Sequence, residues 1–392
     1  MTGGPTHFEL ADKLIRFTRE VYQTDAFIPL HAPLFLGSEK SRVSEAVASG
    51  FVSSVGHSVT EFEERLCQYT GAQHCVATVN GTAALHVALR VAGVELGDEV
   101  ITQSLTFVAT CNAIRYCGAR PVFVDINPSR GGMCPVSLQQ FLSDSTHRGP
   151  DGELRNRHTG RVIKACVPMH NIGHPVEIDR IQAICREHQL SLVEDSAESL
   201  GSFYQGIHTG RYGNLGIFSF NGNKIITTGG GGAIVTDNEA LASQARHLST
   251  TAKRPHPYLY HHDELGYNYR MPALNAALGC AQLDALPHYV ENKRRLAGQY
   301  AAFFDKQGYA FMAEPEGSRS NYWFNSFLAK DLNERNHILE TLNGNEVMAR
   351  PAWTPMHTLE LYRDCHRTDL PNTEWLEERL VSVPSSVVPQ WL

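Results

Sequence analysis

Short apolar runs alternate with helix-like segments through the first half of this chain, and this alternation limits the folds open to it. The apolar runs suit buried strands at residues 75–79, 99–103, 120–124, 162–167 and 191–194. Segments with helical apolar spacing separate them, at residues 82–92, 107–117, 135–143 and 178–188. This order predicts an α/β fold with a mostly parallel sheet and helices on both of its faces. In such sheets ligands bind beyond the carboxyl ends of the strands.

The chain has 392 residues, more than one hydrophobic core usually holds, so we expect a large domain and a smaller one. The first 25 residues show the apolar spacing of an amphipathic helix, and we assign residues 1–30 to an N-terminal helical segment packed on the body. Residues 31–288 are the expected large domain, whose last helix ends near Leu286. Residues 289–392 are the expected smaller C-terminal α+β domain.

Two local patterns predict where elements begin or are interrupted. The run Ser58-Val59-Thr60-Glu61 has the form of a capping box, which predicts a helix that starts there. Residues 145–161 are rich in Gly, Asp, Arg and His, which predicts an exposed loop between two elements.

Charge and composition exclude several classes of partner. The net charge is -7 and the sequence pI is about 6.2, which argues against nucleic acid as a partner. Residues 1–10 lack a signal-peptide pattern, and no run approaches the roughly 18 apolar residues that span a bilayer, so we expect no membrane role. The nine cysteines contain no C-x-x-C pair, which favours reduced thiols in a cytoplasmic protein.

The first chemical signal is a strand, a tight turn and a helix within Val76 to Leu85. Gly81 allows close approach of a ligand to the turn. The free N–H groups and the positive dipole end of the following helix suit a phosphate group. Such turns also occur without any ligand in α/β proteins, so this motif alone does not separate the two interpretations.

A cluster of carboxylates follows the strand at residues 191–194. Asp195 stands where the sheet meets its ligand, and a carboxylate there could keep a ring nitrogen of a bound cofactor protonated. Alternatively, an acid after a strand simply caps the next helix.

The third signal is Phe218 to Lys224, followed by four consecutive glycines at 229–232. Lys224 has Ile225 and Ile226 as neighbours, and loss of hydration there would lower the pKa of its amine. A lysine with a lowered pKa is a nucleophile that forms Schiff bases. Ser219 could donate a hydrogen bond to a phosphate.

Four blocks together resemble one family. They are Asn80-Gly81-Thr82-Ala83-Ala84-Leu85, Glu194-Asp195-Ser196-Ala197-Glu198, Ser219-Phe220-Asn221-Gly222-Asn223-Lys224 and Gly266-Tyr267-Asn268-Tyr269-Arg270-Met271. In this order they resemble the sugar aminotransferases of the DegT/DnrJ/EryC1/StrS family. The resemblance extends from residues 52–56 to residues 350–353, and it is nearest to the aminotransferases of legionaminic-acid pathways.

The resemblance implies a transferase of fold type I that uses pyridoxal 5'-phosphate. Lys224 would hold the cofactor as a Schiff base, with Asp195 at the pyridine nitrogen. The implied cofactor contacts are Gly81, Thr82, Phe107, Asp195, Glu198, Ser219, Asn221, Lys224 and Asn268. Of these, Phe107 would stack on the ring, and Asn268 would come from the neighbouring subunit of a homodimer with shared active sites. The expected substrate contacts are His57, Tyr269, Arg270, Arg350 and His357.

The sequence departs from the family pattern at two positions within the four blocks. Asn80 stands where many members have serine, and Glu198 where many have glutamine or histidine. Neither departure removes a catalytic group, but Glu198 could change the contacts around the cofactor hydroxyl.

The reaction implied by the resemblance moves an amino group from L-glutamate to C4 of a UDP-linked 4-keto-6-deoxy-N-acetylhexosamine. The alternatives are a dTDP- or GDP-linked keto sugar, aminated at C3 or C4, and a sugar dehydratase on the same fold. Lys224 argues against the dehydratase, in which histidine replaces this lysine, and against a non-catalytic binding protein. The lack of a G-x-G-x-x-G turn argues against a nicotinamide-linked dehydrogenase.

His170 and His174 have the spacing of a metal-binding pair on a helix. Gly173 and Pro175 break any helix there, so we expect no metal site.

Overall fold

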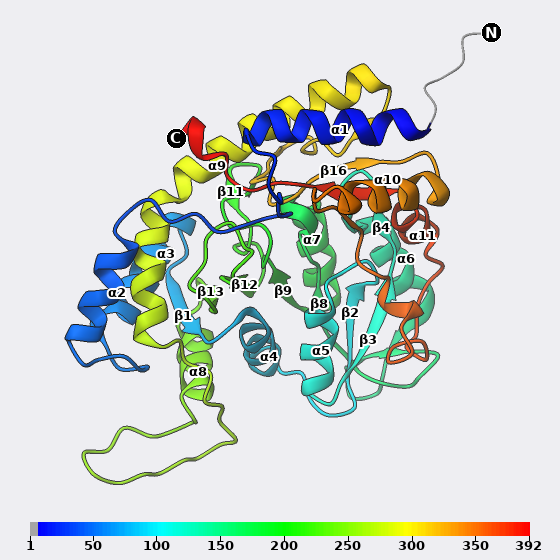
Figure 1. The fold of residues 1–392 in the computed structure, drawn as a ribbon. Helices are drawn as coiled ribbons and strands as arrows, with labels where there is room; N and C mark the ends of the chain where they lie inside the picture. Colours follow the sequence, from blue (N-terminus) through cyan, green and yellow to red (C-terminus); the bar gives the residue numbers. More distant parts are fainter. Residues whose placement is uncertain (1–6) are drawn as a thin grey trace.

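The computed structural model describes residues 7–392, and its centre is a sheet of seven strands (Figure 1). The strand order is β1-β13-β12-β9-β8-β2-β3. Every pairing from β12 to β3 is parallel, and β13 alone runs antiparallel to both of its neighbours. The strands are β1 (His74–Thr78), β2 (Glu99–Gln103), β3 (Arg120–Val124), β8 (Ile163–Val167), β9 (Ser191–Asp195), β12 (Leu215–Ser219) and β13 (Gly232–Thr236).

The predicted α/β fold is confirmed, and the five predicted strands lie within one residue of the strands observed. The alternation did not predict β12 and β13, because no helix separates them. They are joined by residues 220–231, which include Lys224 and three of the four consecutive glycines. Gly232 begins β13, where an added Cβ would lie 2.4 Å from the carbonyl oxygen of Asn80. The glycine is therefore needed for close packing against the turn that precedes α4.

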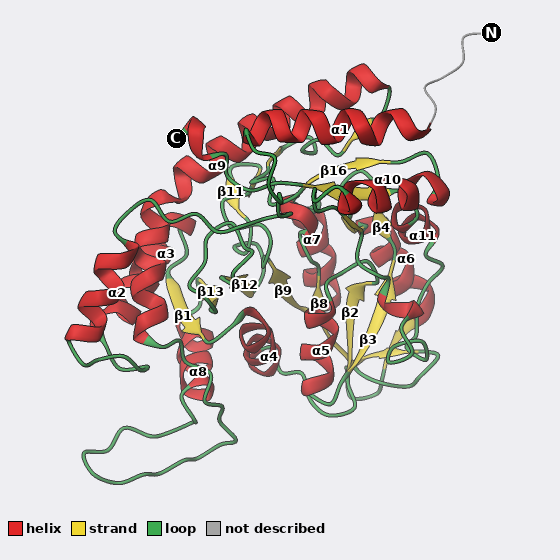
Figure 2. Cartoon of the chain, in the orientation of Figure 1, coloured by secondary structure: helices red, strands yellow, loops and turns green. Residues whose placement is uncertain are grey.

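Helices cover both faces of the sheet, as Figure 2 shows. One apolar cluster joins α4, α5 and α8 to one face. Two others join α3 and α9, and α6 and α7, to the opposite face. Outside the sheet, α2 packs along α9. These helices are α2 (Glu39–Ala48), α3 (His57–Thr70), α4 (Gly81–Val91), α5 (Val108–Tyr116), α6 (Pro135–Ser145), α7 (Ile178–His188), α8 (Glu239–Ser249) and α9 (Ala273–Gln307).

The two ends of the chain share the smaller part of the molecule. Helix α1 packs on α10, and its Leu10 and Leu14 lie in one core with Phe304 of α9. Beside it lies a sheet of order β14-β16-β18-β17. Residues 7–22 of the predicted N-terminal segment therefore form a helix, which packs on the smaller part of the molecule. The elements are α1 (His7–Tyr22), β14 (Ala310–Phe311), β16 (Asn325–Leu328), α10 (Leu332–Gly344), β17 (Arg350–Pro351), α11 (Pro371–Glu377) and β18 (Leu380–Val383).

Helix α9 corrects the expected helix end near Leu286. It runs for 35 residues, with Pro287 inside it. The expected boundary at 288/289 therefore divides a continuous helix, and we propose a boundary after Gln307 instead. Proline removes one helical hydrogen bond, but burial of one face along the helix compensates for this loss.

Two local predictions also need correction. Helix α3 begins at His57 with Gly56 as its N-cap, so the capping box starting at Ser58 lies inside the helix. The segment 145–161 is not wholly a loop, because β6 (Thr146–Arg148) pairs with β7 (Leu154–Asn156) as a hairpin. Its exposed tip follows the prediction, whereas the buried Leu154 attaches it to the core.

The remaining elements are short and connect the larger ones. They are β4 (Ile126–Asn127), β5 (Gly132–Met133), β10 (Phe203–Tyr204), β11 (Ile207–His208), β15 (Ser318–Arg319) and the 3-10 helices η1 (Asn171–Gly173), η2 (Met356–Thr358) and η3 (Pro389–Trp391). All nine cysteines are free thiols. Among residues 7–392, no helix combines the length and the apolar character that crossing a membrane requires.

Candidate active site

A pocket lies at the carboxyl ends of β9 and β12, beside the N-terminus of α4. Of the nine expected cofactor contacts, eight line this one pocket: Gly81, Thr82, Phe107, Asp195, Glu198, Ser219, Asn221 and Lys224. These residues come from segments more than 140 positions apart in the chain. They meet because β1, β9 and β12 end at the same edge of the sheet.

The end of the pocket at α4 is shaped to receive an anion. The Asn80 side chain accepts a hydrogen bond from the Ala83 N–H at 2.7 Å and caps the helix. The N–H groups of the first turn point toward the pocket end, with the positive end of the helix dipole. A Cβ on Gly81 would lie 2.8 Å from Cβ and 3.1 Å from Oγ of Ser219. The absence of a side chain at residue 81 therefore leaves room between the helix and the serine hydroxyl.

Asp195 ends β9 and is almost fully buried. Its Oδ2 accepts a hydrogen bond from the Thr110 hydroxyl at 2.6 Å, and its Oδ1 accepts one from the Ala197 N–H at 3.2 Å. Burial raises the pKa of this carboxyl, while these two hydrogen bonds act in the opposite direction. No helix follows Asp195, so the alternative interpretation as a helix cap is wrong.

Lys224 and Glu198 face one another across the pocket. Nζ of Lys224 lies 3.5 Å from Oε1 of Glu198, and the side chains are 12% and 1% exposed. Burial lowers the pKa of the Lys224 amine, and the negative charges of Glu198 and Asp195 limit the fall. Burial raises the pKa of Glu198 to about 7, against the influence of Lys224. Burial therefore favours the neutral form of both groups, which is the direction expected for a general acid–base pair.

Three expected residues lie outside the pocket of their own chain. Asn268, Tyr269 and Arg270 belong to the α8–α9 loop, residues 250–272, which projects from the body in Figure 1. Asn268 is exposed and pairs with Thr250 through the backbone. Tyr269 stacks on Tyr267 and lies beside His86.

The other expected substrate contacts are dispersed. His57 is exposed at the start of α3. Arg350 is exposed and lines a small cavity that Trp353 separates from the main pocket. His357 is buried, with Nδ1 2.7 Å from Oγ of Ser104 and Nε2 3.8 Å from a Glu374 carboxylate oxygen. His357 is thus held by its own chain rather than presented to the pocket.

The pocket also contains residues that were not among the expected contacts. Trp323, Trp353, Asn223 and Met169 line it. Trp353 falls in the block 350–353, so its presence could have been inferred from that block. Trp323 lies in no motif, and only its packing places its ring centroid 3.8 Å from Nζ of Lys224.

His170 and His174 do not converge on one point. Nε2 of His170 faces Glu194 at 3.1 Å, whereas His174 contacts Ser320 and the carbonyl of Met312. Each imidazole therefore has its own structural partners, which explains their positions without a shared ligand.

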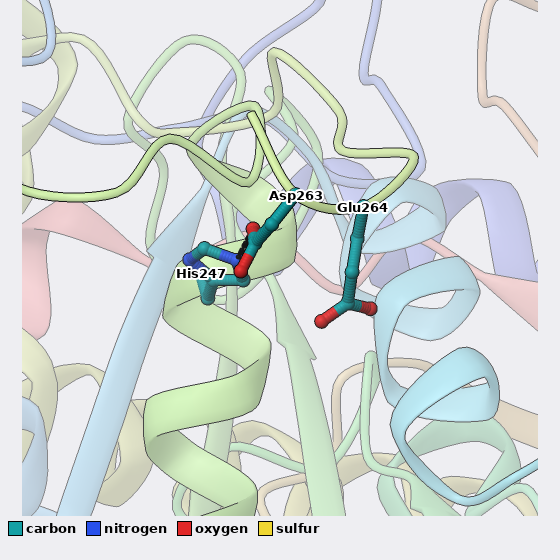
Figure 3. A group of neighbouring side chains, drawn as sticks. All are labelled: His247, Asp263 and Glu264. Carbon is teal, nitrogen blue, oxygen red and sulfur yellow. Dashed lines mark hydrogen bonds and ion pairs between the residues drawn. The ribbon is translucent and has the colours of Figure 1, made fainter. Parts of the chain in front are cut away.

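The group of possible metal ligands found among the described residues is His247, Asp263 and Glu264 (Figure 3). Nε2 of His247 lies 2.7 Å from Oδ1 of Asp263, while Nε of Arg254 donates to Oδ2 at 2.6 Å. A guanidinium on the same carboxylate opposes a cation, and the contacts of Asp263 with His247 and Arg254 fasten the base of the α8–α9 loop.

Comparison with known proteins gives a consistent result over almost the whole chain. Residues 36–388 match the DegT/DnrJ/EryC1/StrS aminotransferase family. EpsN of Bacillus subtilis, whose name assigns it provisionally to the pyridoxal phosphate-dependent aminotransferases, is 38% identical over 86% of this chain and 84% of its own. The GDP-perosamine synthase of Escherichia coli O157:H7 is 33% identical over 92% of this chain and 93% of its own.

Solved structures agree with the fold. DesI, solved with its TDP-sugar product, is 30% identical with a TM-score of 0.79, over 92% of this chain and 88% of its own. PseC of Helicobacter pylori, an aminotransferase involved in pseudoaminic acid biosynthesis, is 25% identical with a TM-score of 0.82, over 91% of this chain and 93% of its own.

Proposed function

We propose that this chain, which belongs to the DegT/DnrJ/EryC1/StrS aminotransferase family, transfers the amino group of L-glutamate to C4 of a nucleotide-linked 4-keto-6-deoxy sugar. The observation that carries the proposal is the position of Lys224. Its amine, with a lowered pKa, lies in one pocket with the buried Asp195 and the N-terminus of α4.

Pyridoxal phosphate is the cofactor of this family, and the residues of the pocket fit it. The space beside Gly81 and Ser219 suits the phosphate group, and Lys224 would bind the aldehyde. Asp195 would face the ring nitrogen, with the exposed Phe107 ring against the cofactor. When bound, this cofactor supplies a carbonyl that amines attack and a ring that withdraws electrons from the neighbouring carbon.

The residues of this chain would bind, orient and move protons around that cofactor. Asp195 would keep a proton on the ring nitrogen, and Thr110 holds the carboxylate in the required orientation. The Lys224 amine, once free, would take a proton from one carbon and return it to another, because it is a base of lowered pKa in a nearly closed site.

The walls of the pocket support a deoxy sugar as acceptor. Phe107 and Trp353 lie edge to face, with ring centroids 5.5 Å apart, and both line the pocket. An apolar surface of this kind suits the methyl group of a 6-deoxy sugar better than a hydroxymethyl group. Arg350, which is exposed near Trp353, would be the contact for a diphosphate.

We first propose a UDP-linked N-acetylhexosamine, because the sequence motifs resemble the legionaminic-acid branch and the structure of PseC, from pseudoaminic acid biosynthesis, matches the fold. A GDP-linked sugar is the second candidate, since the relatives include GDP-perosamine synthases at 32–34% identity.

The functional unit would be a homodimer with shared active sites. Asn268 lies outside the pocket of its own chain, on a projecting loop with exposed apolar side chains. Tyr258, Tyr260 and Leu265 of this loop are 79%, 81% and 83% exposed. Exposed apolar groups of this kind favour burial against a second copy.

The test incubates purified protein with glutamate and, separately, with UDP-, GDP- and dTDP-linked 4-keto sugars. We expect amination at C4, identified by mass spectrometry and NMR, with the UDP-linked N-acetyl sugar as the best acceptor. Turnover of the GDP-linked sugar alone would assign the second candidate. Amination at C3, or of no sugar at all, would contradict the proposal, while oxoglutarate formed from glutamate would still report the first half of the reaction.

A further inference from the structure

The amine of Lys224 is in contact with two side chains, a carboxylate and an indole, in a combination that the sequence motifs did not predict. Its Nζ lies between the Glu198 carboxylate at 3.5 Å and the centroid of the Trp323 ring at 3.8 Å. A carboxylate and an indole face are the two groups that attract an ammonium most strongly.

Glu198 is held by groups on two sides. Its Oε2 accepts a hydrogen bond from the Ile172 N–H at 2.8 Å, which leaves Oε1 directed at Lys224. Ile172 has a φ of 54°, a left-handed conformation that is strained for a β-branched residue. Strain of this kind persists where surrounding contacts enforce it, and it is concentrated at functional sites.

Trp323 is also held by hydrogen bonds from two sides. Its indole N–H donates to the carbonyl of Asn223 at 2.8 Å, one residue before Lys224. Its backbone carbonyl accepts a hydrogen bond from Nζ of the buried Lys293 at 3.2 Å. Tyr322, the preceding residue, has a φ of 48° and thus a second strained backbone.

One buried side chain joins the two groups. Asn321 donates from Nδ2 to the carbonyl of Glu198 at 2.9 Å and accepts at Oδ1 from the Trp323 N–H at 2.8 Å. The Phe324 N–H also donates to the carbonyl of Ile172, at 3.3 Å. The loop after β9, the turn at Ile172 and the segment before β16 therefore form one unit around the lysine amine.

We propose that Glu198 and Trp323 form a rest site for the Lys224 amine in the state in which the lysine is detached from the cofactor, with Glu198 as its proton partner. The proposal rests on the proposed function, since detachment occurs only in an enzyme of this class. In the proton step, one proton moves from the Lys224 ammonium to Oε1 of Glu198. The products are a neutral amine, ready to act as a base, and a carboxylic acid.

Other charged groups face the same amine. Asp195 acts on Lys224 from the end of β9, and Lys293 of α9 lies behind Trp323. His31 is buried, and both of its ring nitrogens lack a hydrogen-bond partner among the described residues. The charges of Lys293 and Lys224 add to burial in lowering the pKa of His31. The raised pKa of Glu198, about 7, and the lowered pKa of Lys224 are consistent with a pair that shares one proton.

The test labels Lys224 in the cofactor-free protein with fluorodinitrobenzene, which reacts with neutral amines only. The rate for the Lys224 peptide, measured by mass spectrometry from pH 5 to 10, gives the midpoint at which the amine loses its proton. For Glu198→Gln we expect this midpoint to fall by about one pH unit or more, as for removal of an opposite charge within ~4–6 Å. Glutamine keeps an acceptor for the Ile172 N–H, which favours a native fold.

Two further variants complete the experiment. Trp323→Phe should lower the midpoint by less than Glu198→Gln, because phenylalanine keeps a weaker aromatic face. Glu61→Gln, at a partly exposed ion pair with Arg42 and Arg65, should leave it unchanged. Unchanged midpoints in both Glu198→Gln and Trp323→Phe, with native circular dichroism, would overturn the rest site. The labelling uses neither sugar nor glutamate, so failure of sugar turnover with a shifted midpoint would contradict the proposed function alone.

Discussion

The Lys224 pocket and the α8–α9 loop differ in how they hold their charged and aromatic groups. In the pocket, Asp195 and Glu198 are buried and receive hydrogen bonds from residues on other segments, Thr110 and Ile172. In the loop, Asp263 is bound by His247 and Arg254, sixteen and nine positions away. The pocket is therefore organised by contacts between distant segments of one chain, whereas the loop is held by contacts between residues that are near one another in the sequence.

In the proposed homodimer, one chain would supply the pocket and a second copy would supply the loop. Ordering of the pocket is already provided by the folding of the protein, which lowers the cost of binding a cofactor. The loop leaves Tyr258, Tyr260 and Leu265 in solvent, an arrangement that a second copy would relieve. The following predictions, from the largest effect to the smallest, test whether the two regions differ as proposed.

Replacing the lysine should have the largest effect. Lys224→Ala should reduce turnover by about 10²–10⁴-fold or more, because the covalent anchor and the proton carrier are lost together. Borohydride reduction should attach the cofactor to the Lys224 peptide in the natural protein and to no peptide in the variant. Lys164→Ala, which removes a surface ion pair with Glu153, serves as the control and should retain full activity. Attachment to another lysine would contradict the assignment.

Filling the anion end of the pocket should weaken cofactor binding. The Cβ in Gly81→Ala would lie 2.8 Å from Cβ of Ser219, and such overpacking costs about 1–3 kcal/mol. Gly298→Ala in α9 is the matched control, because its Cβ meets nothing within 4 Å and should stabilise the helix by about 0.5–1 kcal/mol. Titration with pyridoxal phosphate, followed by absorbance, measures the cofactor affinity of both variants. Equal affinity in both variants would remove Gly81 from the cofactor site.

The pKa of Glu198 predicts a pH-dependent stability. Because folding raises this pKa from 4.5 to about 7, the folded state binds more protons than the unfolded state between these values. The associated stability is present below pH 4.5 and is lost as the pH rises through 7. Relative to the natural cofactor-free protein, Glu198→Gln should therefore gain stability from pH 5 to pH 8, by up to about 3 kcal/mol in the free energy of unfolding. The difference between their melting temperatures, measured at each pH, follows this change. A difference in melting temperature that stays constant with pH would show that folding does not raise the pKa of Glu198.

Asp195→Asn should keep the shape of the pocket and lose the charge. The substitution replaces a charge-assisted hydrogen bond by a neutral one, a loss of about 1–2 kcal/mol, or roughly 5- to 30-fold in rate. Asp237→Asn, in an exposed ion pair with Arg211, is the control and should be active. Steady-state kinetics with glutamate compare the two, and wild-type turnover in Asp195→Asn would remove this residue from the mechanism.

The smallest effect should come from the loop, and it should concern association rather than folding. The double variant Tyr258→Ser with Tyr260→Ser should melt at nearly the same temperature as the natural protein, since both rings are exposed. Its dimer should dissociate several-fold more readily in analytical ultracentrifugation. Leu96→Ser, at an equally exposed apolar residue, should not weaken the dimer.

A second test mixes Lys224→Ala protein with Asn268→Ala protein. Failure to regain activity would show that Asn268 acts in the site of its own chain.

Apolar periodicity was sufficient to predict the α/β class and the five strands that alternate with helices, and the family resemblance was sufficient to predict the residues of the pocket edge. Apolar periodicity is a local property of the chain, and residues that follow parallel strands meet at one edge of the sheet whatever the details of packing. Gly81 and Asp195 were expected at this edge from their positions after the predicted strands, whereas Ser219 and Lys224 were assigned to it by the resemblance to the aminotransferase family, because β12 was not predicted.

Tertiary structure alone decided the features that depend on contacts between distant segments. Helix α9 continues through Pro287 because its buried face packs along both parts of the molecule. His357 is turned toward Ser104 by a contact 253 residues away in sequence. Trp323 reaches Lys224 only because Asn321 and Lys293 hold its backbone. No local pattern records these contacts, because each depends on which distant groups burial brings within reach.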